Sequence, residues 1–400
     1  MRVASNLLYQ QTMLAIQTQQ QRLTKLQSQM ASSVRVQTAS DDPVAAGQLL
    51  TLQKSLADVT QWQSNVTSLQ SRLGIEDSTM GSVYDSLTQI QSYALQANNA
   101  TLSDSDRQAL AQQIQAQFKQ LIAFSNTQDS NGRYIFGGTQ DGGTPFVQAS
   151  GGGVSYNGNS SFSFLAVGPS SQIASSDPGD SVFMNIKSGN GIIDAAGSSA
   201  NTGTAYVSNA QVTDSTQYDG GSYSISINGG QYQVTDSGGA VVSSGTYTAD
   251  SAVQFRGLSV TLSGTAADGD TFSITPAKSQ DLFTTIQNLA TAVVAAGSTT
   301  TAAQRAQGQT NLYQALQSLQ TAMGHVSEIR SGVGAREATL DDNTSRLQDL
   351  SAQYQKTVSG YQDLDYASAS TQFSQTQLVL QAAEQSYVSI QGLSLFNYLR

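Results

Sequence analysis

Cysteine is absent from this 400-residue chain, and histidine occurs once, at position 325. A chain without cysteine has no disulfide scaffold, no thiolate nucleophile and no Cys/His zinc site. The single imidazole lies in a helical heptad segment where no Ser-His-Asp arrangement can be assembled, so we expect His325 to be structural or exposed. The sequence therefore predicts no enzyme activity, no catalytic residue, no cofactor and no metal site.

Charged residues are scarce as well, at 12% of the chain, and 28 acids against 18 bases give a net charge of -10. A surplus of acid argues against binding to a phosphate backbone, so nucleic acid is not an expected partner. No stretch approaches the roughly eighteen consecutive apolar residues of a membrane-spanning helix, so we expect no membrane insertion. Ser5 and Asn6 interrupt the apolar start of the chain, which argues against a cleaved secretory signal.

The few charges are unevenly distributed. The first forty residues contain no acid, and the last thirty-five contain only Glu384 and Arg400. Between Asp141 and Lys278 there are ten Asp, no Glu and three bases, which gives this region a charge of about -7. We therefore expect nearly uncharged amphipathic ends and an acidic, solvent-exposed insert.

Two long segments carry apolar residues every seven positions, one in each half of the chain. Such a stripe cannot be covered by the helix that bears it, so each segment needs a partner helix along its length. The simplest partner for one segment is the other, which predicts an antiparallel coiled-coil rod. The expected rod core comprises Leu52, Val59, Val66, Leu73, Leu87, Val333, Leu340, Leu347 and Tyr354.

A helix start signal precedes the first of these segments, in Ser40, Asp41, Asp42 and Pro43. Ser and Asp side chains accept hydrogen bonds from the free N-H groups of a first helical turn, and Pro at the first position loses no bond. An acid/base pair made of Asp41 and Asp42 is a weaker interpretation, because capping already explains both carboxylates. The helix is expected to run from Pro43 to about Asn99.

The composition changes to Gly, Ser, Thr, Asn and Asp after Gly138, which marks the start of a mainly antiparallel β insert. Asn228-Gly229-Gly230 predicts a hairpin turn, because Asn and Gly tolerate positive φ. The run Gly151-Gly152-Gly153 lacks the Lys of a phosphate loop and is expected to be a linker. Asp268-Gly269-Asp270 lacks the spaced oxygen ligands of a calcium loop and is expected to be a β-turn. We expect two lobes divided near residue 205.

The two ends of the chain carry apolar stripes that have no packing material except each other and neighbouring copies. The expected self-assembly residues are Leu7, Ile16, Leu23, Met30, Phe373, Leu380, Tyr387, Leu395 and Phe396. An ordinary coiled-coil end within one chain is the alternative. The expected α+β organisation is assembly segment 1–42, rod 43–139, β insert 140–278, rod 279–366 and assembly segment 367–400.

One block of the N-terminal region resembles a known signature. Arg35-Val36, followed by Ser40-Asp41-Asp42-Pro43-Val44-Ala45-Ala46, is similar to that of the flagellin superfamily. Several further segments resemble the branch of this superfamily that forms the hook-filament junction: Thr101–Arg107, Asn131–Gly138, Val333–Arg336 and Ser394–Leu399. Ser33-Val34 departs from the Gly-Lys found in many members. Gly269–Pro276 of the insert resembles a strand that recurs in flagellar axial proteins.

The resemblance implies an extracellular structural adaptor of the bacterial flagellum, located between the first hook-associated protein and flagellin and needed for filament assembly and motility. It further implies a homo-oligomeric ring, export through the flagellar type III apparatus, and a cytoplasmic export chaperone that binds near the C-terminus. We expect residues 3–34 and 373–399 to be largely disordered before assembly and to order on it.

Two alternatives remain open from the sequence. The nearer one is a flagellin-type filament subunit, which only the junction-type motifs separate from the adaptor. The more distant one is a secreted adhesin or enzyme with its activity in the β insert.

Overall fold

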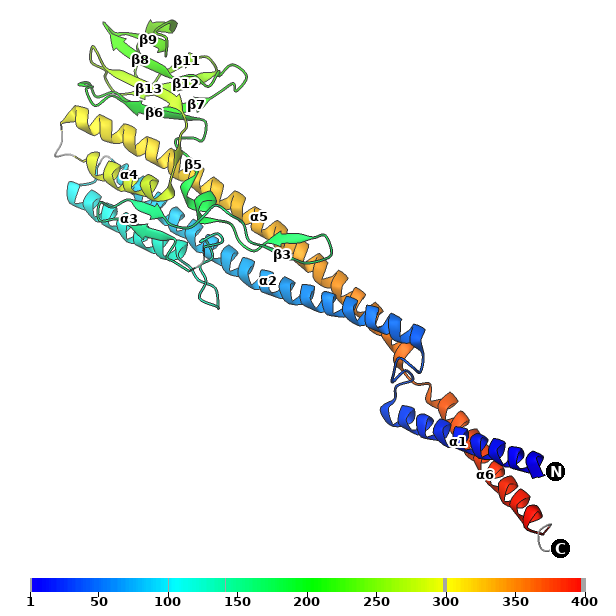
Figure 1. Cartoon of the computed structure of the whole chain (residues 1–400). Helices are drawn as coiled ribbons and strands as arrows, with labels where there is room; N and C mark the ends of the chain where they lie inside the picture. Colours follow the sequence, from blue (N-terminus) through cyan, green and yellow to red (C-terminus); the bar gives the residue numbers. More distant parts are fainter. Residues whose placement is uncertain (1, 100, 141, 298–300, 397–400) are drawn as a thin grey trace. The chain divides into compact units, whose positions relative to one another are not determined.

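The computed structural model describes residues 2–99, 101–140, 142–297 and 301–396, and the chain forms two compact units (Figure 1). Unit 1 comprises Met1–Ser64 and Asn343–Arg400, and unit 2 comprises Asn65–Asp342. The two longest helices, α2 (Pro43–Ala97) and α5 (Ala302–Gln362), contribute residues to both units. Long helices at both ends and an antiparallel β region between them confirm the α+β class.

Unit 1 contains two further helices, α1 (Arg2–Ser32) and α6 (Tyr366–Phe396), which lie side by side (Figure 1). They run antiparallel: the rings of Tyr9 and Tyr387 are 5.4 Å apart near one end, and the Tyr366 hydroxyl donates to the Met30 carbonyl at the other. Short segments, 33–42 and 363–365, connect these helices to α2 and α5. We call the two connecting segments the joint.

Unit 2 has a helical part in which α3 (Asp104–Ser125) and α4 (Leu282–Ala295) pack against α2 and α5. Side chains cap both shorter helices: the Ser103 hydroxyl accepts from the Asp106 N-H at 3.2 Å, and the Asp281 carboxylate accepts from the Thr284 N-H at 2.6 Å. Five phenylalanines at the centre of this core contact one another edge to face or tilted: Phe118, Phe136, Phe146, Phe183 and Phe283.

Short strands and a π-helical turn cover the helical part of unit 2. They are β1 (Phe146–Gln148), β2 (Val154–Tyr156), β3 (Phe164–Ala166), β4 (Gln172–Ala174), η1 (Asp180–Met184), β5 (Ile186–Lys187) and β14 (Ser279–Gln280). Strands β1 and β2 form a hairpin, and Gly151-Gly152-Gly153 lies in its loop with Gly152 at φ 96°. The expectation of a linker there was wrong, because short strands flank the glycines on both sides.

Residues 193–276 form a separate lobe with its own core, which we call the β lobe. Its strands are β6 (Ile193–Gly197), β7 (Tyr206–Val212), β8 (Tyr223–Asn228), β9 (Gln231–Asp236), β10 (Val241–Thr246), β11 (Ala252–Phe255), β12 (Leu258–Ser263) and β13 (Thr271–Pro276). They form a five-stranded antiparallel sheet in the order β10-β9-β8-β13-β6 and a three-stranded sheet in the order β11-β12-β7. Strand β6 lies next to β7 and β10 next to β11, so the two sheets meet at both edges.

The register of the β lobe settles two expectations from the sequence. Asn228 pairs with Gln231 across the turn between β8 and β9, which confirms the hairpin at Gly229-Gly230. The division near residue 205 was wrong, because Ile193 and Val207 belong to the same core and β6 pairs with β13. The β lobe therefore begins at Ile193, where the composition does not change.

Two acids of the β lobe, Asp268 and Asp270, bond to the backbone of nearby loops. The Asp270 carboxylate is 1% exposed and accepts from the N-H groups of Thr202, Gly203 and Ala267 at 2.9, 3.2 and 2.8 Å. Asp268 accepts from the Gly229 N-H at 2.7 Å. These two carboxylates stabilise loops by accepting hydrogen bonds from backbone N-H groups. Asp268 and Asp270 therefore contribute negative charge to the insert because they form turns.

Polar side chains of α5 bind the β lobe at its edge. The Thr310 hydroxyl accepts from the Val207 N-H at 3.2 Å, and the Tyr313 hydroxyl accepts from the Ala210 N-H at 2.7 Å. The backbone groups of edge strand β7 are thus satisfied by a helix, which is one way in which proteins protect a sheet edge. Over the described part of the chain, no helix combines the length and apolar character that a membrane span needs.

Candidate assembly surface and joint

The two connecting segments of the joint bind each other through their backbones. The Arg35 N-H donates to the Gln362 carbonyl at 2.7 Å, and the Leu364 N-H donates to the Ser33 carbonyl at 3.1 Å. Val34 and Asp363 form the antiparallel bridge between these bonds. The passage from α1 to α2 is therefore tied to the passage from α5 to α6.

The Arg35 side chain reinforces this connection. Its guanidinium donates to the Tyr361 carbonyl at 2.8 Å and contacts the Asp42 carboxylate at 3.3 Å. Its own carbonyl accepts from the Gln29 side-chain amide at 2.6 Å. One residue thus links α1, the start of α2 and the end of α5.

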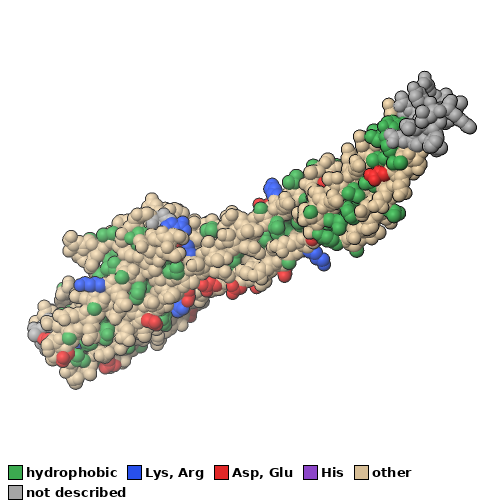
Figure 2. All heavy atoms as spheres, turned by 90° about the horizontal axis from the view of Figure 1, so that it is seen from below, with side chains coloured by type: hydrophobic (Ala, Val, Ile, Leu, Met, Phe, Trp, Pro, Cys, Tyr) green, Lys and Arg blue, Asp and Glu red, His purple; other side chains and the backbone are tan. Residues whose placement is uncertain are grey.

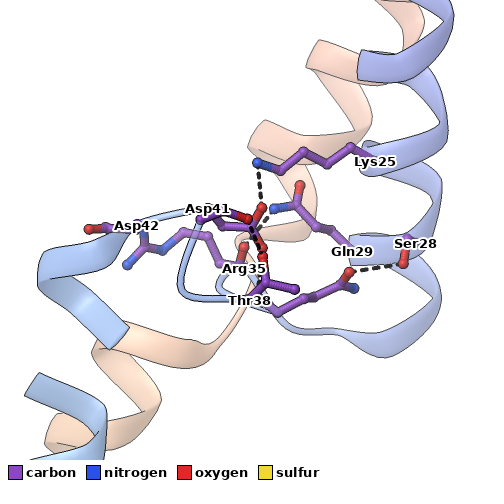
Figure 3. A network of polar contacts seen from close by, with 9 residues as sticks. Lys25, Ser28, Gln29, Arg35, Thr38, Asp41 and Asp42 are labelled. Atoms are coloured by element: carbon purple, nitrogen blue, oxygen red, sulfur yellow. Dashed lines mark hydrogen bonds and ion pairs between the residues drawn. The ribbon is translucent and has the colours of Figure 1, made fainter. Parts of the chain in front are cut away.

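The two neighbouring carboxylates of the start signal have different partners (Figure 3). Asp41 accepts from the N-H groups of Gln37 and Thr38 at 3.1 and 2.9 Å and forms an ion pair with Lys25 at 2.7 Å. The hydrogen bond from Lys25, followed by the Thr38 N-H, lowers the pKa of Asp41 from 3.8 to about 2. Asp41 therefore closes the turn of the joint and binds it to α1.

Asp42 makes the capping bond of α2. Its carboxylate accepts from the Ala45 N-H at 3.0 Å, and this bond, with the nearby Arg35, lowers the pKa of Asp42 below its usual value. Ser40, which the sequence placed in the cap, shares a 2.8 Å hydrogen bond with the Thr38 hydroxyl, and Pro43 is the first residue of α2. The cap of α2 is thus the Asp42 carboxylate alone, and Ser40 and Asp41 stabilise the turn that precedes it.

Most expected self-assembly residues lie in the seam between α1 and α6. Ile16 is 8% exposed, and five others are half-buried: Leu23, Met30, Phe373, Leu380 and Tyr387. Leu7 is 57% exposed. Leu395 and Phe396 end α6, and their side chains lie outside the described residues.

A different set of apolar side chains on this helix pair points to solvent, and the heptad pattern does not predict most of it. These outer apolar residues are Leu7, Leu14, Leu378, Val379 and Val388, which are 48% to 69% exposed. Figure 2 shows hydrophobic side chains exposed on this helix pair. The sequence does contain a signal for these residues: they are leucines and valines that lie outside the heptad stripe of glutamine-rich helices. Since a helix pair covers only one side of each helix, apolar residues outside the stripe are expected to be exposed.

The expected rod-core residues are mostly buried. Seven of them are at most 2% exposed: Val59, Val66, Leu73, Leu87, Val333, Leu340 and Leu347. Leu52 and Tyr354 are half-buried. Within unit 2, α2 and α5 are also linked by a bidentate ion pair between Asp77 and Arg330, at 2.9 and 3.2 Å.

A buried carboxyl pair lies beside this interface in unit 2. The Glu76 side chain on α2 is fully buried, and one of its oxygens accepts from the Asp177 N-H at 2.9 Å while the other has no hydrogen-bond partner. Burial and the adjacent Asp177 charge raise the pKa of Glu76 from 4.5 to about 8. Arg336 on α5 forms an ion pair with Asp177. No local sequence pattern predicts this pair, because Glu76 and Asp177 are distant along the chain.

The remaining candidates have structural partners. The His325 ring nitrogen lies 2.8 Å from the Ser181 carbonyl and ties α5 to η1. In the described ranges, no group of three or more His, Cys, Asp or Glu side chains could hold a metal ion.

Three family matches cover most of the chain. Residues 3–141 match the bacterial flagellin N-terminal helical region, and residues 316–399 match the bacterial flagellin C-terminal helical region. Residues 196–276, nearly the whole β lobe, match the D2-like domain of flagellar hook-associated protein 1.

Two curated relatives are named flagellar hook-associated protein 3. The Salmonella typhimurium protein is 37% identical over 152 residues, which are 38% of this chain and 48% of that protein. The Escherichia coli K12 protein is 34% identical over 202 residues, which are 50% of this chain and 62% of that protein. The matched part of the chain thus spans about half to three fifths of the length of these relatives.

Solved structures resemble the chain over nearly their full length. One crystal structure of Xanthomonas campestris FlgL has a TM-score of 0.72 at 31% identity and covers 77% of this chain and 99% of its own. The flagellar junction protein FlgL from Legionella pneumophila has a TM-score of 0.70 at 30% identity and covers 78% of this chain and 100% of its own. The chain belongs to the family of flagellar hook-associated protein 3, or FlgL.

Proposed function

We propose that this chain is a structural adaptor of the bacterial flagellum that joins hook-associated proteins to the flagellin filament. The relatives support this role, since the Legionella protein is titled a flagellar junction protein and both curated relatives are hook-associated proteins. The role is structural and involves no catalysis. Its proposed partners are other copies in a ring, the first hook-associated protein and flagellin.

The observation that carries the proposal is the helix pair α1/α6 with its outer apolar residues. Leu14 and Leu378 are 63% and 69% exposed on opposite helices, although both helices already bury a seam against each other. Exposed leucine on a nearly uncharged helix pair is typical of a surface that another protein covers. We propose that export through the flagellar type III apparatus, with a cytoplasmic chaperone near the C-terminus, precedes this assembly.

The first test is genetic. A strain that lacks the protein is expected to build hooks and to shed unpolymerised flagellin into the medium, and the intact chain is expected to restore filaments. Long filaments formed by the purified chain alone would instead favour a flagellin-type subunit.

The second test changes the outer apolar residues. Leu14→Gln combined with Leu378→Gln is expected to leave the fold intact, because both side chains are exposed and Gln is a good helix former. The copies retained on isolated hooks are expected to fall about tenfold or more, as when apolar anchors of an interface are lost. Gln11→Ala combined with Gln377→Ala is the matched control, since both glutamines are exposed on the same helices. Normal retention of the leucine variant would refute the assigned surface.

A further inference from the structure

The helix pair α1/α6 carries very few charges. Of its described side chains, only Arg22 and Lys25 on α1 and Glu384 on α6 are charged. Lys25 forms its ion pair with Asp41 in the joint. Arg22 and Glu384 are exposed, and neither has a partner among the residues that the structure describes.

Arg22 and Glu384 do not meet within one copy. Tyr9 lies opposite Tyr387 and Met30 lies opposite Tyr366, so the residue opposite Arg22 on α6 is close to Ser374. Glu384 is ten residues beyond Ser374, which is about 15 Å at about 1.5 Å per residue. The two charges are therefore separated along the pair by more than a direct ion pair allows.

The two charges also lie on opposite faces of the pair. Arg22 precedes the seam residue Leu23 by one position, whereas Glu384 follows the seam residue Ala383 by one position. One residue turns a helix by about 100°, so each side chain is displaced from the seam to one side. The two helices are antiparallel and face each other. The residue just before a seam residue of α1 therefore lies on one face of the pair, and the residue just after a seam residue of α6 lies on the opposite face.

Each of these faces also exposes a valine of α6. Val388 follows seam residue Tyr387 by one position and shares the face of Glu384, and Val379 precedes seam residue Leu380 by one position and shares the face of Arg22. Val379 is 48% exposed and Val388 is 65% exposed. We call the two faces the Arg22 face and the Glu384 face.

One axial shift makes the two faces complementary. Moving a second copy by about ten residues, or about 15 Å, places its Glu384 at the level of Arg22. The same shift, in the same direction, places Val388 of the second copy within one residue of the level of Val379, since these valines are nine positions apart. The charge pair and the valine pair consist of different residues, yet both indicate the same axial register between copies.

We propose that copies of this chain pack with the Arg22 face of one against the Glu384 face of the next, staggered by about 15 Å, and that the ion pair between Arg22 and Glu384 sets this register. A face that meets a different face generates rings or helices rather than closed pairs. A lone charge covered by a neighbour loses its hydration, and only an opposite charge offsets that loss. This inference rests on the proposed assembly of copies into a ring.

Charge reversal tests the ion pair. Arg22→Glu and Glu384→Arg are each expected to reduce the copies retained on isolated hooks about tenfold, and the variant with both changes is expected to recover to within about twofold of the original. Gln20→Glu and Gln377→Arg, exposed positions on the face opposite to Arg22 and about 10 Å or more along the pair from Glu384, are the controls and are expected to assemble normally. Normal assembly of both single variants, or no recovery in the double variant, would overturn the pair.

A cysteine experiment tests the register without changing a charge. The chain has no cysteine, so Val379→Cys with Val388→Cys provides the only thiols. The two positions are about 13 Å apart on opposite faces of one copy, beyond the reach of a disulfide. Oxidation of assembled hooks is expected to give a ladder of linked copies, whereas Ser374→Cys with Val388→Cys, both on the Glu384 face, gives none. Absence of the ladder would overturn the register, while failure of the unchanged chain to restore filaments would refute the proposed function instead.

Discussion

At the scale of single residues, the joint shows what an isolated sequence signal can and cannot specify. A Ser-Asp-Asp-Pro run predicted a helix start, and α2 does begin at Pro43. Composition alone did not reveal that Asp42 caps the helix while Asp41 binds Lys25 and the preceding turn. That difference depends on the backbone direction at each residue and on a lysine sixteen positions earlier, which no local pattern contains.

Glu76 gives a prediction about pH. Its pKa in the folded chain, about 8, is above its ordinary value of 4.5, so the folded state holds a proton that the unfolded state releases. The stabilising effect is therefore complete below pH 4.5 and is lost as pH rises towards 8, with a change in the free energy of unfolding on the order of a few kcal/mol. Glu76→Gln keeps an acceptor for the Asp177 N-H and has no proton to lose. We expect this variant to lose much less stability over that interval.

Denaturant unfolding at several pH values between 4.5 and 8.5 measures this effect. Glu328→Gln on α5 is the matched control, because it makes the same side-chain change at an exposed position. The control is expected to retain the pH dependence of the original chain. Equal pH dependence for the Glu76 variant and the original chain would show that the carboxyl pair does not bind the additional proton.

At the scale of helices, heptad spacing predicted the positions of the helices correctly. It was a poorer guide to which partner covers each helix surface. The periodic stripes correspond to α2 and α5, and stripe residues such as Leu73 and Leu340 are fully buried. The same spacing in α1 and α6 selected seam residues such as Ile16 for assembly between copies. A period identifies the side that must be covered, and it does not say whether a helix of the same chain covers it.

The helix pair α1/α6 is expected to be the less stable part of the chain. Its buried apolar side chains among the described residues are Ile16, Leu26 and Ala369, which are 3% to 8% exposed, whereas α2 has a stripe of fully buried residues such as Leu73, Met80 and Leu87. A helix in water depends mostly on the packing of its apolar face. We therefore expect α1 and α6 to open far more often in the unassembled chain than the parts of α2 and α5 in unit 2.

Limited proteolysis of the purified chain measures this difference. Cleavage after Arg22 and Lys25 is expected at least about tenfold faster than cleavage after Arg72 and Arg330, which lie within unit 2. Cleavage after Lys356 near the end of α5 reports whether opening extends beyond the joint. Equal protection of α1 and of unit 2 would contradict the expectation that the ends order on assembly.

At the scale of the whole chain, the β lobe is a module with a core of its own. In the Salmonella typhimurium relative, 152 aligned residues are 48% of the protein, which corresponds to a length of about 320, roughly 80 residues shorter than this chain. The match to the D2-like domain covers residues 196–276, a segment of similar size. Composition predicted the insert. Its true start at Ile193 and its attachment through Tyr313 depend on contacts between distant segments, which the sequence pattern does not show.

The β lobe is expected to be removable. Its first and last strands are paired, with Ile193 opposite Pro276, so a short Gly linker can replace residues 194–275 without stretching the chain. The core of the helical part is a separate cluster that includes Leu87, Phe183 and Val326, and it loses no member in this deletion. We expect the shortened chain to fold with its helices intact and to restore filaments and swimming in a strain that lacks the protein.

Circular dichroism and thermal unfolding test the fold of the shortened chain, and a motility assay tests its function. Deletion exposes the Thr310 and Tyr313 hydroxyls, which then bond to water, so the lost hydrogen bonds are confined to the surface of α5.

A matched control removes only the β8–β9 hairpin, which interrupts the five-stranded sheet and leaves a damaged lobe attached. We expect this control to unfold or aggregate more readily than the clean deletion, because its exposed strand edges have no partner. A folded but non-motile clean deletion would show that the junction depends on the β lobe, and an adhesin or enzyme activity lost with it would place a second function there.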